Sequence, residues 1–422
     1  MGSEMCIRDR LQLETALPSA TLVVERCRVT EAVHAAEPLW AEVDALSTSA
    51  LLELKALQGE QMTLRLMRSD GSRRHWHGYV VRAAQLGADG GLARYRLTLA
   101  AWTHWLTHRR DTRIFQDRTT QDIVSEVLAA WPQAHFRFDL AQPGPLRAIT
   151  TQYRETDWRF VCRLMAQEGW SWRLEHAGPQ DGSDQARATV AGARAARHTL
   201  VIFDDQAEVP DLGTLRFSRP DMRGAGLLGT GLFDDGLAQD TVTAWRVGRH
   251  VGANAVTVAA WDERQLAGVA GAATALTDQG VVPLLEDYRG HGERQHAEGR
   301  VTTAQPASTA VAEARAQARM AAHELHHTRA EGDSAVRALH EGARFLLTEH
   351  SLYGAAAALA ATARSAMGGG GALTEPTAPG AFRVLRVVHE AANNLGSEAA
   401  RLLRQADIEP VSYTHLTLPT KA

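Results

Sequence analysis

The sequence lacks the features that mark several classes of protein. It has no apolar run of about eighteen residues, which argues against a transmembrane helix. Its N-terminus does not show the charged-then-apolar layout of a signal peptide. Only three cysteines occur, Cys6, Cys27 and Cys162, and none forms a CxxC pair, so a reducing cytosol is the simplest folding environment. The net charge of −4 gives no sign of phosphate-driven binding to nucleic acid.

What is present is the composition of an ordinary globular protein. Hydrophobic residues make up 45% of the chain and charged residues 22%. A chain of 422 residues is too long for one compact core, so we expect two or three domains.

The two ends differ from the rest of the chain. The opening MGSEMCIRDR and the closing VSYTHLTLPTKA resemble translated sequencing-adapter sequence. The body is rich in Arg and Ala, whereas the closing segment has neither until Ala422. We therefore expect residues 1–10 and 411–422 to be artefactual extensions that take no part in the fold, and the chain to be a fragment.

The first hundred residues predict an antiparallel β-meander. Apolar Met62, Leu64 and Leu66 alternate with polar residues, which is the period of a half-buried strand, and residues 93–99 alternate in the same way. Asp70-Gly71 supplies turn chemistry between such strands. Several strands with tight turns in a short length indicate a barrel or a sandwich.

The middle of the chain predicts a small α/β domain. Thr119 and Asp122 have the spacing of a capping box before an amphipathic helix, and Thr156 is an N-cap for a second helix that Gly169 ends. The segments WSWRLEH and HTLVIFDD then predict a pair of strands.

Strand patterns return after residue 240, in TVTAWRVGRHV, NAVTVAAWD, FLLTEH and FRVLRVVHEA. A helix is expected from Thr309 to His327, and residues 354–380 read as an Ala/Gly-rich loop. The apolar stripe expected on this helix consists of Val311, Ala314, Ala318, Ala321, Ala322 and Leu325.

One motif on this helix could support catalysis. His323, Glu324 and His327 match H-E-x-x-H, in which the two imidazoles bind zinc while the glutamate activates a water molecule. With 18 histidines in the chain, such a match also arises by chance, and the pair lies off the expected apolar stripe on a face that we interpret as solvated. A third ligand would be needed, and the downstream candidates lack a signature spacing: His340, Glu341 and His350.

The other candidate residues favour packing over chemistry. His75 and His77 share one strand face, and His104 and His108 follow, with no Cys or carboxylate among them, so we expect surface or interface packing and no metal site. The sequence has no GxSxG, phosphate loop or dinucleotide fingerprint. Most of the following tryptophans are expected in the core: Trp76, Trp102, Trp105, Trp158, Trp170, Trp172 and Trp245.

Six phrases in order resemble the hub portion of VgrG proteins, the spike-tip components of type VI secretion systems, which look like the central hub of contractile phage tails. The phrases are HGYVVRAAQLGADGGLARYRLTLAAW, RRDTRIFQDRTTQDIV, QYRETDWRFVCRLMAQEGWSWRLEH, DTVTAWRVGRHV, EGDSAVRALHEGARFLLTEH and FRVLRVVHEAANNL. The resemblance implies a β-rich α+β fold of two β-barrel-like domains with an inserted α/β domain. The boundaries that we assign are 11–112, 113–215 and 216–395, followed by a linker at 396–410 that would lead to a missing needle.

The resemblance also implies a function and partners. The expected role is a non-enzymatic structural hub without cofactors, which joins a hexameric Hcp tube to a trimeric needle. The expected partners are a homotrimer of this chain, the Hcp tube, baseplate components and effectors attached through the missing part. The hub would assemble in the cytoplasm and be exported by the apparatus, with no nucleic acid partner and no insertion into a membrane. A phage baseplate hub and a zinc-dependent hydrolase remain as alternatives.

Overall fold

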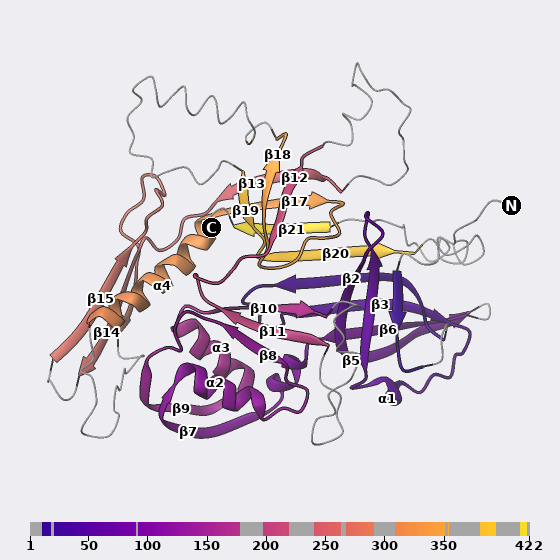
Figure 1. The fold of residues 1–422 in the computed structure, drawn as a ribbon, viewed down its shortest axis with the longest axis horizontal. Helices are drawn as coiled ribbons and strands as arrows, with labels where there is room; N and C mark the ends of the chain where they lie inside the picture. Colours follow the sequence, from indigo (N-terminus) through magenta and orange to yellow (C-terminus); the bar gives the residue numbers. More distant parts are fainter. Residues whose placement is uncertain are drawn as a thin grey trace, which may run out of the picture.

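The computed structural model describes residues 11–17, 21–89, 92–177, 197–218, 240–262, 267–290, 309–350, 353, 380–393 and 414–419. Strands dominate, and a ten-stranded sheet runs through the centre of the molecule (Figure 1). The predicted β-rich α+β fold is therefore confirmed. Within these ranges, no helix has both the length and the hydrophobicity needed to cross a bilayer.

The large sheet combines strands from both ends of the chain. In spatial order, its members are β1 (Leu11–Glu14), β4 (Gln61–Met67), β5 (Arg73–Asp89), β6 (Leu92–Ala100), β3 (Leu39–Ser47), β2 (Val23–Ala32), β20 (Arg386–Ala392), β21 (Thr414–Pro419), β17 (Thr328–Ser334) and β13 (Val242–Arg249). Two short helical segments accompany its first half, α1 (Leu54–Leu57) and the 3-10 helix η2 (Trp102–Thr107).

The predicted meander is confirmed in β4, β5 and β6, which pair as antiparallel neighbours. The alternation buries Leu64 and Leu97 on the inner face. Gly71 adopts a φ of +82° in the turn between β4 and β5, a conformation that side chains other than Gly rarely take. The adjoining turn at residues 89–91 lies partly outside the described residues.

The inserted α/β unit contains both predicted helices, α2 (Thr120–Ala129) and α3 (Asp157–Gln167). Thr119 and Asp122 form the expected capping box, and the Thr156 hydroxyl accepts a hydrogen bond from the N–H of Arg159. The helices lie beside a two-stranded ribbon and a three-stranded sheet (Figure 1). The ribbon is β7 (Arg110–Thr119) with β9 (Leu146–Thr156), and the sheet is β10 (Ser171–His176), β11 (His198–Phe203) and β8 (Phe136–Asp139).

The inserted unit shares a core with the first part of the large sheet, β1 to β6, which we call the first barrel. One continuous buried cluster includes Leu99 of β6, Trp102 of η2, Phe160 of α3 and Ile202 of β11. Six of the tryptophans expected in the core are buried, and Trp105 packs against the same cluster, so that prediction is confirmed. The insert therefore folds onto the barrel and has no separate core.

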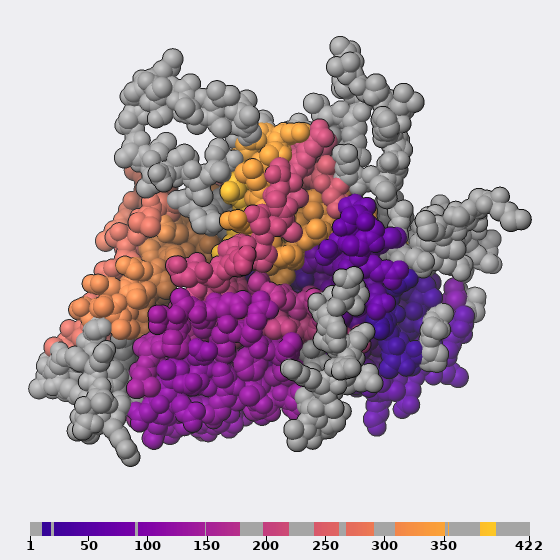
Figure 2. Space-filling model, in the orientation of Figure 1, coloured from indigo at the N-terminus to yellow at the C-terminus, as the bar shows by residue number. Residues whose placement is uncertain are grey.

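The second half contains two further sheets and one helix. Their members are β12 (Asp211–Arg216), β18 (Arg344–Thr348) and β19 (Ala381–Arg383) in one sheet, β15 (Ala267–Thr274), β14 (Ala255–Asp262) and β16 (Glu286–Gly290) in the other, and α4 (Thr309–His327). We call β14, β15, β16 and α4 the arm, because they project to one side of the molecule (Figure 2).

The predicted helix at Thr309–His327 is confirmed, but its predicted apolar stripe is wrong. Ala314, Ala321 and Ala322 are exposed, and the buried face is formed instead by Ala312, Arg315, Ala316, Met320 and His327. The reason lies at Gly271 of β15, where a Cβ atom would stand 2.2 Å from the backbone nitrogen of Glu313. This close approach determines which face of α4 packs on the sheet. The alanines of α4 do not determine it, because an alanine is compatible with a buried or an exposed position.

Two strand pairings cross the boundaries that we assign from the sequence. Residues 386–392 were assigned to the second barrel, yet β20 pairs with β2 of the first. Residues 411–422 were expected outside the fold, but β21 pairs with β17 and with β20. β21 lies between β20 and β17, and its backbone pairs on both sides. Backbone pairing does not depend on side-chain identity, so a tail of unrelated composition can still form a strand. The predicted loop at 354–380 and linker at 396–410 lie outside the described residues, except for Gly380.

Candidate functional site

The glutamate of the H-E-x-x-H motif is engaged by the protein itself. Glu324 Oε1 accepts hydrogen bonds from the backbone N–H groups of Leu276 and Thr277, each at 2.7 Å, and from the Thr277 hydroxyl at 2.5 Å. A zinc hydrolase needs this carboxylate to contact the metal-bound water. Here it fixes the loop between β15 and β16 instead.

The two histidines of the motif contact different segments. His323 Nε2 lies 3.0 Å from a carboxylate oxygen of Asp287 on β16, which lowers the pKa of that carboxyl. His327 is only 4% exposed, and its Nδ1 lies 2.9 Å from the Gln279 amide nitrogen. The prediction that this helix face is solvated is therefore wrong, because the motif faces the sheet and the loop of the arm.

The candidate third ligands lie elsewhere. His340 and Glu341 belong to a junction between domains, and His350 packs on Phe217 with ring centroids 4.6 Å apart. In the described part of the chain, no group of three His, Cys, Asp or Glu side chains is arranged to hold a metal ion.

The histidines of the first barrel range from buried His77 to exposed His108, and each contacts a neighbouring side chain. His77 is buried between the Thr63 hydroxyl, at 2.8 Å, and the Ala177 carbonyl, at 2.9 Å. His75 stacks on His77 with centroids 6.0 Å apart. His104 lies 2.8 Å from Glu37 and 3.1 Å from His108.

A cluster of titratable side chains lies where three parts of the chain meet. We call Glu31, Arg74, His176, Glu341 and His389 the junction cluster, whose members come from β2, β5, β10, the segment after β17, and β20. Four of these residues are buried, and His176 is partly buried, with a side chain that is 8% exposed. Arg74 forms an ion pair with Glu31 and donates to the Leu339 carbonyl. His389 donates to the same carbonyl at 2.9 Å and lies 3.7 Å from Glu31.

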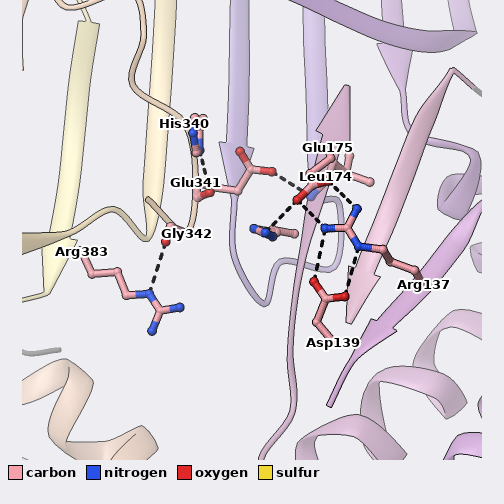
Figure 3. Close-up of polar contacts among 9 residues, drawn as sticks. Arg137, Asp139, Leu174, Glu175, His340, Glu341, Gly342 and Arg383 are labelled. Carbon is pink, nitrogen blue, oxygen red and sulfur yellow. Dashed lines mark hydrogen bonds and ion pairs between the residues drawn. The ribbon is translucent and has the colours of Figure 1, made fainter. Parts of the chain in front are cut away.

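Glu341 connects this cluster to the inserted unit (Figure 3). Its Oε1 accepts a hydrogen bond from the N–H of Leu174 at 2.9 Å, on the free edge of β10. On the next residue of that strand, Glu175 binds Arg137 of β8 at 2.5 Å, and Arg137 also reaches Asp139 at 3.1 Å. Arg383 donates to the Gly342 carbonyl at 3.3 Å from the opposite side.

Burial sets the protonation states at this junction. Desolvation, reinforced by the negative charge of Glu31, raises the pKa of the Glu341 carboxyl well above its usual range. Desolvation lowers the pKa of His176 and of His389 well below the usual histidine value. It also lowers the pKa of His77 and of His340 to about 4, so these imidazoles are neutral at pH 7.

Sequence reasoning missed Glu31 and Arg74, although a signal was present. Arg74 and Trp76 are two residues apart and share the inner face of β5. Glu31 and Val29 likewise share the inner face of β2, so both charged side chains occupy inward positions. The Arg74 guanidinium lies 4.8 Å from the Trp76 ring centroid. A charge at an inward position needs a partner, and here the partner is 43 residues away in sequence.

These contacts hold distant parts of one chain together. The buried charges are used in ion pairs and backbone hydrogen bonds across the junction, and both free cysteines among the described residues, Cys27 and Cys162, have a raised pKa through desolvation. A β-rich chain whose parts are joined by such a junction has the character of a structural component of an assembly.

Comparison with known families identifies that class more closely. The chain belongs to the phage tail baseplate hub (GPD) family, whose profile matches residues 30–395.

The predicted resemblance to VgrG proteins is also confirmed. The type VI secretion system spike protein VgrG1c of Pseudomonas aeruginosa is 38% identical over 135 residues, which are 32% of this chain and 19% of that protein. VgrG5 of the same organism is 30% identical over 269 residues, which are 62% of this chain and 30% of that protein. The matched part thus spans less than a third of these relatives.

Solved structures share the fold. An Escherichia coli protein, c3393, described as a type VI secretion component similar to the T4 tail proteins gp27 and gp5, superposes with a TM-score of 0.59 at 15% identity, over 97% of this chain and 77% of that chain. A tail protein from Neisseria meningitidis gives a TM-score of 0.58 at 12% identity, over 98% and 96% of the two chains. At these identities the likeness shows the fold alone, which is that of tail hub proteins.

Proposed function

We propose that this chain is the structural hub of a type VI secretion spike. In this role it joins a hexameric Hcp tube to a trimeric needle. The observation that carries the proposal is the 30–38% identity to secretion spike proteins within a chain that matches a tail hub family over residues 30–395.

The hub would act as a homotrimer, with the Hcp tube, baseplate components and effectors as partners. Its task is mechanical, because a trimer must match a sixfold tube to a threefold needle and transmit thrust through its interfaces. Obligate interfaces of this kind bury on the order of 2,000 Å² or more. The division into units at 11–112, 113–215 and 216–395 is part of this proposal, with the strand exchange through β20 linking the first unit to the third.

We also propose that the described region makes and breaks no covalent bond and needs no cofactor. The engagement of Glu324 by the arm loop supports this, because three protein donors converge on its Oε1 atom. The hub would assemble in the cytoplasm and leave the cell through the apparatus.

A phage baseplate hub is the second candidate. The breadth of the likeness to the Neisseria tail protein, over 98% of this chain and 96% of that one, favours it. The fold serves both roles, so the two candidates differ in the tube that the hub meets.

A chimaera tests the secretion role. Residues 11–393 would replace the matching segment of VgrG1c in Pseudomonas aeruginosa, and export of Hcp into the medium would be measured. Export restored above the level of a strain without VgrG1c supports the proposal. A chimaera that is stably produced and trimeric but exports no Hcp favours the phage baseplate role.

A further inference from the structure

Two exposed, largely uncharged surfaces are unexplained by the fold. The first, which we call the ribbon face, is the outer side of β7 and β9 and consists of Thr112, Ile114, Gln116, Ile149, Thr151 and Tyr153. The second, which we call the arm loop, is residues 275–285, between β15 and β16. Most of the large apolar side chains exposed in the described residues lie in these places or next to them.

The ribbon face is regular and rigidly supported. Its residues form three directly opposed pairs across the two strands, 112 with 153, 114 with 151 and 116 with 149, and none of them is charged. Ile114 is 65% exposed and Tyr153 is 63% exposed. On the other side of the ribbon, Phe115 stacks on Phe160 of α3 with centroids 5.6 Å apart, so the core holds the ribbon in place.

The arm loop is an apolar protrusion that polar contacts hold in shape. Leu276 and Leu284 are 87% and 74% exposed, and Val281 is fully exposed. The backbone beneath them is fixed by Glu324, as described above, and by Asn254, whose side chain donates to the Pro283 carbonyl at 2.9 Å and accepts from the Leu285 N–H at 2.8 Å. Exposed apolar side chains on a loop of defined shape are typical of a docking element.

The arrangement suits a ring of identical copies. A closed ring with threefold symmetry uses heterologous contacts, so each copy must present two different surfaces that fit one another. The ribbon face lies along the lower border of the inserted unit, whereas the arm projects from the side (Figures 1 and 2). The two surfaces therefore belong to different parts of one copy.

Charges of opposite sign lie at one border of each surface, and the further charges there are paired on their own strands, Asp111 with Arg113 and Arg289 with Asp287. Arg110 and Arg154 are exposed at the Tyr153 end of the ribbon face, and the Arg154 guanidinium lies 5.3 Å from the Tyr153 ring centroid. The arm loop has one charged residue, the exposed Asp278, and Glu286 is exposed where the loop enters β16. Opposite charges around an apolar centre favour a specific mutual orientation.

We propose that the arm loop of one copy of this chain packs on the ribbon face of the next copy, and that this contact closes the homotrimer. The proposal rests on the trimeric hub proposed above and assigns its interface. It also gives a role to the H-E-x-x-H motif, whose Glu324 and His327 hold the arm loop in its docking shape.

Mixing variants tests the pairing of these two surfaces. Ile114→Asp alters only the ribbon face, Val281→Asp alters only the arm loop, and Leu51→Asp, at a position that is 92% exposed in the first barrel, is the matched control. Sedimentation of each purified chain over a concentration series reports its mass. We expect the unaltered chain and Leu51→Asp to be trimeric and each of the other two variants to be monomeric. A one-to-one mixture of Ile114→Asp and Val281→Asp retains one intact contact, so it should form a heterodimer and no ring.

The failures of the two proposals give different results. If the unaltered chain trimerises and both variants remain trimeric, the assigned interface is wrong and the hub proposal stands. If both variants are monomeric and their mixture forms no heterodimer, the assigned interface is also wrong and the hub proposal stands, because the two surfaces then do not contact each other. If the unaltered chain is monomeric at every concentration, the homotrimer is contradicted and the interface with it.

Discussion

Glu341 accepts a hydrogen bond from the backbone N–H of Leu174 at 2.9 Å, and this contact connects the second half of the chain to the edge strand of the inserted unit. Both groups are buried. The carboxyl belongs to the same cluster as the Glu31–Arg74 ion pair, which lies in the first barrel. One side chain therefore contributes to the relative placement of three parts of the hub.

Removal of this acceptor should destabilise the protein. Glu341→Ala leaves the Leu174 N–H buried without a partner, which costs about 1–3 kcal/mol of unfolding free energy. Glu341→Gln keeps an oxygen acceptor of the same shape and should lose less than about 1 kcal/mol. Urea unfolding at pH 7 measures both variants. Equal stability of Glu341→Ala and the unaltered protein would show that the contact does not hold the junction.

Acid should destabilise the protein as its buried histidines become protonated. The pKa of His77 falls from about 6.5 when unfolded to about 4 when folded, so its contribution to stability is present above pH 6.5 and is lost as the pH falls through 4. This loss amounts to about 3 kcal/mol at pH 4 for His77 alone. His198, with a pKa of about 3, acts in the same direction.

The raised pKa of Glu341 acts in the opposite direction, because stability from a raised carboxyl is lost as the pH rises above about 4.5. The histidines are more numerous, so the net free energy of unfolding should fall between pH 6.5 and 4. Urea titrations across this range test the sign. His77→Gln keeps a donor near the Ala177 carbonyl but cannot be protonated, and it should flatten the profile. An unfolding free energy that is constant from pH 7 to pH 4 is inconsistent with the buried neutral imidazoles.

Glu324 should behave as a structural residue. Glu324→Ala removes the acceptor of the Leu276 and Thr277 N–H groups, so the amide hydrogens of residues 276 and 277 should exchange faster, while Glu324→Gln keeps an oxygen and should protect them. The zinc content of the purified protein should be negligible in all three forms. About one zinc per chain in the unaltered protein, lost in His323→Ala, would instead support the hydrolase alternative.

Gly271 should be intolerant of a side chain. A Cβ atom there would stand 2.2 Å from the Glu313 nitrogen, so Gly271→Ala must displace α4 from β15, at a cost of about 1–3 kcal/mol. Gly268→Ala is the matched control, because it lies on the same strand and its Cβ would meet no atom within 4 Å. Thermal unfolding compares the two. If both variants melt at the same temperature, α4 does not pack as described.

Local features of the fold could be predicted from the sequence. The capping box of Thr119 and Asp122 and the N-cap of Thr156 depend on residues within three positions of each other. The alternation of Met62 and Leu64 with polar residues depends on the pleat of one strand. Such signals need no knowledge of distant partners.

The orientation of α4 and the junction cluster could not be predicted in the same way. Alanines occupy several faces of α4, so periodicity does not select the buried one; the space left by Gly271, 42 residues before Glu313, does so. Glu31 and Arg74 can be recognised as partners only when β2 and β5 are known to lie in one sheet. The H-E-x-x-H motif was correctly placed on a helix, yet its use depends on the loop at residues 276–279, which local spacing does not reveal.

The stoichiometry of the complex with the tube tests the central claim most directly. Native mass spectrometry of this chain mixed with a hexameric Hcp ring reports the number of copies of each protein in the complex. A structural hub predicts three copies of this chain on one hexameric ring. A complex with one or six copies per ring, or no complex under conditions in which VgrG1c binds, would contradict the role of this chain as the adaptor between a sixfold tube and a threefold spike.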